Sequence, residues 1–280
     1  MPQNINIGVS FKRTHLQDIM MEDQPIDFFE VHAENYFTPS PIAHQALEQI
    51  CTQYALSIHG VGLSLAGTAP LDEDHIDQLR TLYQRYQPCL LSEHLAWSVD
   101  DKHYYNDLWP IPYNQASLDH LCQRIHHAQD KIGCALLIEN PARYVDFAEN
   151  DMEEGIFFTQ LCHNTGCGML LDITNLTISG YNLNFDPRHA LASYPIERIG
   201  EIHFAGCEYR SHSQIMIDSH AAPISKSSMS LYHALKAMWK AMPQDRQKNT
   251  ITHPYLLMEW DNHVPAWDVF RQEAQRLRAL

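Results

Sequence analysis

The segments ALLIE (residues 135–139) and MLLD (residues 169–172) are short apolar runs that each end on a carboxylate. Further runs of this kind occur along the chain, and from the third onward each ends on His, Glu or Asp. Such groups are costly at the ends of buried strands unless something pairs with them. In an eight-stranded parallel barrel all these ends meet at one mouth, where catalytic residues lie. The pattern therefore predicts an α/β fold, a (β/α)₈ TIM barrel with a polar mouth. The predicted strands are Ile5–Ser10, Asp27–Glu34, Ala55–His59, Cys89–His94, Ala135–Glu139, Met169–Asp172, Ile199–His203 and Tyr255–Glu259.

Helical patterns separate these runs. Ser40 and Pro41 supply an N-cap and a proline at the first helical position, and Gly133 is placed to end a later helix. Alternating strands and helices predict a parallel sheet with right-handed crossovers. The length of 280 residues fits one such barrel, so residues 1–280 are expected to form a single domain. Two long loops, Ala96–Tyr113 and Ala205–Ile224, follow the fourth and seventh runs, on the side where barrels carry function.

The composition excludes several classes of protein. A formal net charge of −15 argues against a nucleic-acid partner, because phosphate contacts need clustered Lys and Arg. The chain has no GxGxxG after the first run and no P-loop, so nucleotide binding has no support. Seven cysteines without a CxxC pair favour a reduced, cytoplasmic protein. No secretory signal is visible, and no apolar run reaches the roughly 18 residues that cross a membrane.

Three imidazoles and three carboxylates are expected to point into the predicted mouth. A single His at a strand end is more often a hydrogen-bonded structural residue, so the argument depends on the convergence of six groups. Crowded carboxylates and imidazoles repel or stay unsatisfied without cations. Mixed oxygen and imidazole ligands suit iron, manganese or zinc. We therefore expect a centre of two ions, with Glu139 and Glu259 as candidates for shared ligands. The six residues are His59, His94, Glu139, Asp172, His203 and Glu259.

A second, more exposed group of donors follows in the loops. The segment IDSHAAP places Asp218 and His220 on one side of an extended stretch. Asn175 lies three residues after Asp172. These residues could form a third metal position, although spacing alone fits an ordinary surface loop equally well.

The second run, FFEVHAENYF, carries three polar residues in alternation. Glu30, His32 and Glu34 are expected to share one face of the strand. Groups at such positions can orient the imidazoles that bind a metal. Glu93 adjoins His94 and is expected to point the opposite way, outside the site.

Eight segments resemble, in order, the multinuclear non-heme iron-dependent oxidases, a family that includes the methanobactin-biosynthesis oxidase. The resemblance implies a xylose isomerase-like TIM barrel with two or three irons at its mouth. It implies an oxidoreductase that uses O₂ to modify cysteines of a ribosomally synthesised precursor peptide, in natural product biosynthesis. It also implies a separately encoded partner protein that presents the peptide. The segments are ENYF (34–37), HGVGLSL (59–65), SEHLAWS (92–98), IENPARY (138–144), GCGMLLDITN (166–175), EIHFAG (201–206), DSHAAPI (218–224) and MEWD (258–261).

The resemblance also implies a set of ligands for each iron. The four ligands of the second iron are the expected catalytic groups. It assigns His59, His94, Glu139 and Glu259 to one iron, Glu139, Asp172, His203 and Glu259 to a second, and Asn175, Asp218 and His220 to a third.

Two departures and two rival functions accompany the resemblance. The chain has LSLAG (63–67) where the family commonly has LSLG. Cys207 follows FAG where the family commonly has His. This change lies near the expected active mouth, so it bears on the chemistry of the local pocket and on the identity of the substrate. The first rival is a divalent-metal hydrolase or isomerase of the xylose isomerase-like or endonuclease class, which would activate water on zinc, manganese or magnesium. The second is a non-enzymatic barrel that stores metal or binds peptide.

Overall fold

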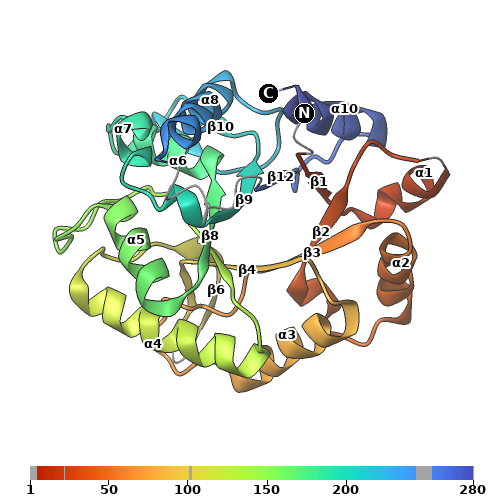
Figure 1. Cartoon of the computed structure of the whole chain (residues 1–280), viewed down its shortest axis with the longest axis horizontal. Helices are drawn as coiled ribbons and strands as arrows, with labels where there is room; N and C mark the ends of the chain where they lie inside the picture. Colours follow the sequence, from red (N-terminus) through yellow and green to blue (C-terminus); the bar gives the residue numbers. More distant parts are fainter. Residues whose placement is uncertain (1–4, 22, 101–102, 244–253, 280) are drawn as a thin grey trace.

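The computed structural model describes residues 5–21, 23–100, 103–243 and 254–279. Eight parallel strands close into a barrel in the order β1-β12-β9-β8-β7-β4-β3-β2, which confirms the predicted TIM barrel. Helices surround the barrel on its outer side (Figure 1). The strands are β1 (Ile7–Ser10), β2 (Phe28–His32), β3 (Ala55–Gly60), β4 (Leu90–His94), β7 (Leu137–Glu139), β8 (Gly168–Asp172), β9 (Ile199–Phe204) and β12 (Tyr255–Met258).

Local sequence sets the ends of the helices. The side chain of Asn114 accepts a hydrogen bond from the amide of Ser117 at the start of α4, and Gly133 ends that helix in the left-handed conformation. Asp72 caps α3 through the amides of Asp74 and His75. The helices are α1 (Leu16–Met21), α2 (Pro41–Cys51), α3 (Glu73–Tyr86), α4 (Gln115–Ile132), α5 (Glu154–Thr165), α6 (Ile173–Asn182), α7 (Pro187–Leu191), α8 (Lys226–Ala241) and α10 (Trp267–Arg278).

The two faces of each strand have different roles. In β9, Ile202 and Phe204 belong to the apolar core between barrel and helices. Glu201 and His203 alternate with them and are fully buried inside the barrel. Polar side chains thus lie inside the barrel, whereas apolar packing between the strands and the surrounding helices stabilises it. This division fixes the positions of the interior groups on rigid strands.

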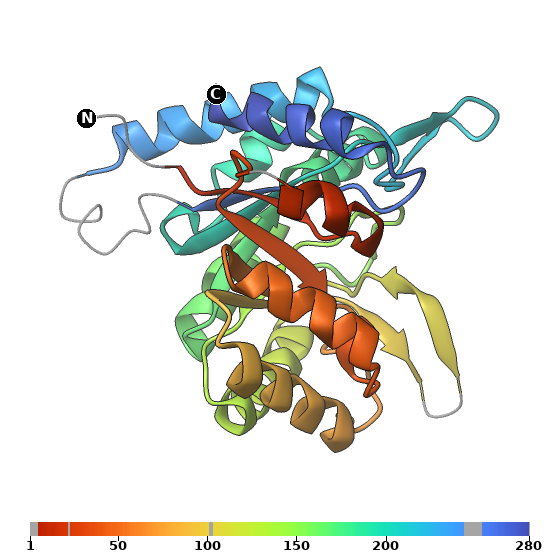
Figure 2. The same ribbon diagram turned by 90° about the vertical axis from the view of Figure 1, so that its right-hand side faces the viewer.

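The two long loops fold into hairpins. The first forms β5 (Trp97–Val99) and β6 (Tyr104–Trp109), and the second forms β10 (Glu208–Arg210) and β11 (Ile215–Ile217). Both hairpins project from the same side of the barrel in Figure 2. This is the side toward which the arrow of β2 points, so both flank the carboxyl ends of the strands.

One local expectation is wrong, and one helix was not predicted. The second strand ends at His32, and the 3-10 helix η2 (Ala33–Tyr36) follows, so Glu34 is not part of the strand. The turn lets Glu34 reach the amides of the loop after β3 instead of the barrel interior. Helix α6 was also not expected, because Asp172 is both the last residue of β8 and the cap of this helix. Among the described residues no helix is long and apolar enough to cross a bilayer.

Candidate metal centre

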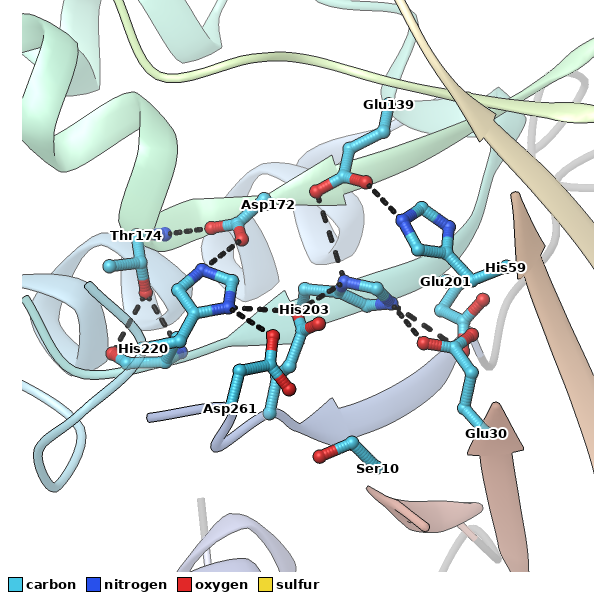
Figure 3. Close-up of polar contacts among 12 residues, drawn as sticks. Ser10, Glu30, His59, Glu139, Asp172, Thr174, Glu201, His203, His220 and Asp261 are labelled. Carbon is cyan, nitrogen blue, oxygen red and sulfur yellow. Dashed lines mark hydrogen bonds and ion pairs between the residues drawn. The ribbon is translucent and has the colours of Figure 1, made fainter. Parts of the chain in front are cut away.

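The ends of β3, β4 and β7 bring two imidazoles onto one carboxylate. His59 Nε2 and His94 Nε2 each lie 3.2 Å from Glu139 Oε2. All three residues are buried, and Glu139 Oε2 has no hydrogen-bond partner among the described residues. Figure 3 shows Glu139 pointing from its strand toward His59. An orphaned buried carboxylate oxygen between two imidazoles is an arrangement that a cation would satisfy.

The far side of each imidazole is already occupied. Ser92 Oγ lies 2.7 Å from His59 Nδ1, and the carbonyl of Gly60 lies 3.2 Å from His94 Nδ1. If each Nδ1 carries the proton, both Nε2 atoms present a lone pair toward Glu139. Metal-bound imidazoles are usually held in this way by a partner on the second nitrogen. Burial lowers the pKa of His94 to about 4, which keeps that ring neutral near pH 7.

Glu139 faces a third imidazole with its other oxygen. Its Oε1 lies 3.8 Å from His203 Nδ1, while its Oε2 faces His59 and His94. Glu259 Oε2 lies 3.1 Å from the same nitrogen of His203. Burial opposes the ionisation of Glu139, but His94 and His59 outweigh it and lower its pKa to about 2. A charged carboxylate with imidazoles on both oxygens has the geometry of a ligand that bridges two ions.

Asp172 is the N-cap of α6, and backbone amides of the first turn of this helix hold its side chain. Its Oδ1 accepts hydrogen bonds from the amides of Thr174 at 2.6 Å and Asn175 at 2.8 Å. Its Oδ2 has no hydrogen-bond partner among the described residues and lies 3.8 Å from His220 Nε2 (Figure 3). Burial and the charge of Glu139 raise the pKa of Asp172 well above its usual value. One oxygen therefore anchors the residue and the other is aimed at the centre.

The outer group gathers around His220. Asp218 Oδ1 lies 2.7 Å from its Nε2, and Glu259 Oε2 lies 3.3 Å from its Nδ1. Asn175 is buried, and its Oδ1 has no hydrogen-bond partner in the part of the chain described. Asn175 and Asp218 line one cavity at the mouth. Asn175 and Asp218 thus lie at one opening, and His220 contacts Asp218 beside it.

Carboxylates dominate the interior below the mouth. His203 Nε2 lies 3.2 Å from Glu30 Oε1 and 4.0 Å from Glu201 Oε1, and neither oxygen of Glu201 has a hydrogen-bond partner among the described residues. Burial alone would lower the pKa of His203, but Glu30 and Glu259 raise it well above its usual value. The donors are carboxylate oxygens, imidazole nitrogens and one amide oxygen, which fit iron, manganese or zinc.

Several residues at the centre were not expected or only partly expected. His32 Nε2 lies 3.4 Å from Glu259 Oε1, so Glu30 and His32 both face the interior and Glu34 does not. Glu201 and Asp261 were overlooked, and Asp261 Oδ2 lies 3.3 Å from His220 Nδ1. Both stand two residues from an expected ligand, and this period-two spacing was the available signal.

A cavity of about 400 Å³ opens onto the centre. His94, Asn175 and Asp218 form part of its wall, and Tyr104 and Asn106 of hairpin β5–β6 form another part. Cys207 is half-buried nearby, and burial together with the charge of Asp218 raises the pKa of its thiol. The cavity leaves the outer donors Asn175 and Asp218 accessible from outside the barrel.

Comparison with known proteins identifies relatives over nearly the whole chain. Residues 6–280 match the family described as RiPP precursor modification enzyme MbnB/TglH/ChrH. The UPF0276 protein RB0508 of Rhizobium meliloti is 39% identical over 277 residues, which cover 98% of this chain and 86% of that protein. A UPF0276 protein of Paraburkholderia phytofirmans is 41% identical over the same coverage.

Solved structures share the fold at low sequence identity. The 3-keto-D-glucoside 4-epimerase of E. coli has a TM-score of 0.58 at 13% identity, with 99% of this chain and 100% of that chain covered. Endonuclease IV of Thermus thermophilus has a TM-score of 0.55 at 15% identity, with 98% and 96% covered. At such identities the likeness shows the barrel fold alone.

Proposed function

The chain belongs to the family of RiPP precursor modification enzymes MbnB/TglH/ChrH, and on that premise we propose a specific reaction for it. We propose that it is a multinuclear non-heme iron-dependent oxidase that uses O₂ to modify cysteines of a ribosomally synthesised precursor peptide. The observation that carries the proposal is Glu139, whose two oxygens face His59 and His94 on one side and His203 on the other. This arrangement supports two adjacent ions that share one carboxylate.

The proposed ligands are the sets that the resemblance to the iron oxidases implies, and the contacts around Glu139 support them in part. We propose Glu259 as the second shared carboxylate. Its Oε2 lies within 3.3 Å of nitrogens of His203 and His220, so it faces the second and third positions. Bound iron would supply Lewis acidity toward a cysteine thiol and redox equivalents for O₂. Zinc or manganese fits the same donors, so the metal is a point for experiment. The proposed set is His59, His94, Glu139 and Glu259 for one ion, Glu139, Asp172, His203 and Glu259 for a second, and Asn175, Asp218 and His220 for a third.

The residues of the chain then have distinct tasks. Ser92 and the Gly60 carbonyl orient the imidazoles of the first position. Glu30 holds His203 from the opposite side of its ring. The buried interior excludes water from the shared carboxylates, whereas the cavity beside Asp218 remains open. A peptide cysteine would enter through this cavity and approach the centre from the outer position.

The proposal includes a macromolecular partner and a location. Hairpins β5–β6 and β10–β11 flank the mouth and offer surfaces for the precursor peptide and for a separately encoded protein that presents it. All seven cysteines are free thiols, which supports a cytoplasmic setting. The hydrolase or isomerase alternative gains no support beyond the shared fold of the epimerases and endonuclease IV.

Metal analysis of protein purified without oxygen tests the proposal. We expect two or more irons per chain, and O₂ consumption when a cysteine-containing precursor peptide and its partner are added. Glu139→Gln is expected to lose iron, whereas Glu273→Gln is the control, because Glu273 is a buried carboxylate that binds Arg276 and the Ile224 amide. Stoichiometric zinc without affinity for iron would overturn the proposed chemistry. Full iron content in Glu139→Gln would overturn the ligand assignment.

A further inference from the structure

A second cluster of metal-binding side chains lies apart from the centre. Glu34 of η2, His75 of α3 and Glu93 of β4 each offer one donor atom, and these atoms all lie within 4.8 Å of one another. His75 Nε2 is 3.3 Å from Glu34 Oε1. Glu93 points away from the barrel interior although His94, the next residue, points into it. Three elements distant in sequence therefore converge on one polar point.

In both carboxylates of this cluster one oxygen accepts hydrogen bonds from backbone amides and the other oxygen has no hydrogen-bond partner among the described residues. Glu34 Oε1 accepts hydrogen bonds from the amides of Val61 at 2.9 Å and Gly62 at 2.8 Å, and Glu93 Oε1 accepts one from the amide of His94 at 3.2 Å. Glu34 Oε2, Glu93 Oε2 and His75 Nε2 have no hydrogen-bond partner among the described residues. Glu93 is only 2% exposed, so water does not solvate it freely. The unsatisfied oxygens are costly in this state.

The backbone around the cluster leaves room for these side chains. A Cβ on Gly60 would lie 2.2 Å from Glu93 Oε2, and one on Gly62 would lie 3.1 Å from His75 Cε1. Glycine at both positions therefore permits the carboxylate and the imidazole to approach the loop after β3. Among the described residues, the one ion pair of this cluster joins His75 and Glu34, and no Lys or Arg balances the two carboxylates.

We propose that Glu34, His75 and Glu93 form a further binding site for a divalent transition-metal ion, separate from the centre at the mouth. Two carboxylate oxygens and one imidazole nitrogen suit Mn²⁺, Fe²⁺ or Zn²⁺. A divalent ion would balance both carboxylates and satisfy all three orphaned atoms. It would also join α3 and β4 to the loop that follows His59, through the amides held by Glu34.

Anomalous diffraction on the wild-type chain tests this site without any substitution. Metal-free protein is crystallised with Zn²⁺ alone and, separately, with Mn²⁺ alone, and data are collected at the absorption edge of each metal. We expect a peak among Glu34 Oε2, His75 Nε2 and Glu93 Oε2. No peak there, in crystals whose mouth is occupied, would overturn the proposal.

Metal counting in solution provides a second test that is independent of activity. Glu139→Gln protein loaded with Zn²⁺ is expected to retain the ion of this cluster, and the further substitution His75→Asn is expected to remove one equivalent per chain. His127→Asn is the control, because His127 also lies on a helix and pairs with a glutamate, Glu73, at the surface. Equal metal content with and without His75 would overturn the proposal. Failure of the proposed oxidase would instead appear as a mouth that binds no iron.

Discussion

Ser92→Ala removes the group that orients the first imidazole of the centre. Ser92 Oγ lies 2.7 Å from His59 Nδ1, and both residues are about 1% exposed, so solvent cannot replace the hydroxyl. The substitution leaves a buried ring nitrogen without a partner and allows the imidazole to rotate. We expect weaker binding of the metal at the first position with little change in the fold.

The magnitude follows from the environment of this hydrogen bond. Leaving a buried polar atom unsatisfied costs about 1–3 kcal/mol. Loss of a group that orients a metal-bound imidazole typically weakens metal binding about 10–100-fold. Each tenfold change corresponds to about 1.4 kcal/mol, so the two ranges agree. We therefore expect the dissociation constant for Fe²⁺ or Mn²⁺ to rise about 10–100-fold in Ser92→Ala.

An anaerobic titration of metal-free protein with Mn²⁺, followed by electron paramagnetic resonance, measures this change. Ser228→Ala is the matched control, because Ser228 is equally buried and its hydroxyl lies 2.9 Å from Ser225 Oγ, at the start of α8. The control should lower the free energy of unfolding without changing metal affinity. Unchanged affinity in Ser92→Ala would refute the assignment of His59 as an oriented ligand. An equal loss in both variants would refute the claim that the effect is local.

Three other predictions concern the remaining parts of the centre. Asp172→Asn should weaken metal binding at least about tenfold, yet it should raise the free energy of unfolding of the metal-free protein near pH 7. Burial raises the pKa of Asp172 in the folded protein. At a pH above the unfolded pKa its ionisation therefore opposes folding, and asparagine removes this penalty. Calorimetry with and without metal separates the two effects. Tyr144→Phe removes the hydroxyl oxygen that accepts a hydrogen bond from the amide of Asp218 at 2.9 Å. The affinity for the outermost ion should fall about tenfold while the inner ions stay bound. Metal counting during dialysis would show this difference. Metal affinity should rise with pH by up to about tenfold per unit for each proton displaced, because the carboxylates that flank His203 and His220 raise the pKa of both imidazoles against the effect of burial. A pH-independent affinity from pH 6 to 8 would contradict this last prediction.

The barrel was predictable because its polar strand ends are unusual in sequence. Apolar runs that stop at His59, Glu139 or Glu259 have few structural explanations other than a shared mouth. The spacing alone could not show which oxygen of Glu139 faces which imidazole, since that depends on the closure and register of the barrel. Residues at strand ends were thus found from the sequence, whereas their mutual geometry required the structure.

The missed features arise where a strand passes directly into a helical segment. Asp172 ends a strand and also caps α6, and a helix directly after it was not predicted from the sequence. Glu34 continues the alternation of the second run, but η2 breaks the strand before it. In both cases a helical segment follows directly on a strand and changes the direction of the side chains, and such boundaries leave weak signals in a single sequence.

The rigidity of the proposed ligands differs between the inner and outer positions. His59, His94 and Glu139 lie on strands that pair with one another in register, so their spacing is fixed by the ladder of the barrel. His220 instead lies in a loop with a backbone φ of 44°, where its carbonyl accepts the amides of Asp261 and Asn262. A residue in this conformation is strained and depends on these local contacts. The outer position should therefore exchange its ion more readily than the inner ones, and a substrate that enters beside Asp218 would meet the most adaptable part of the centre first.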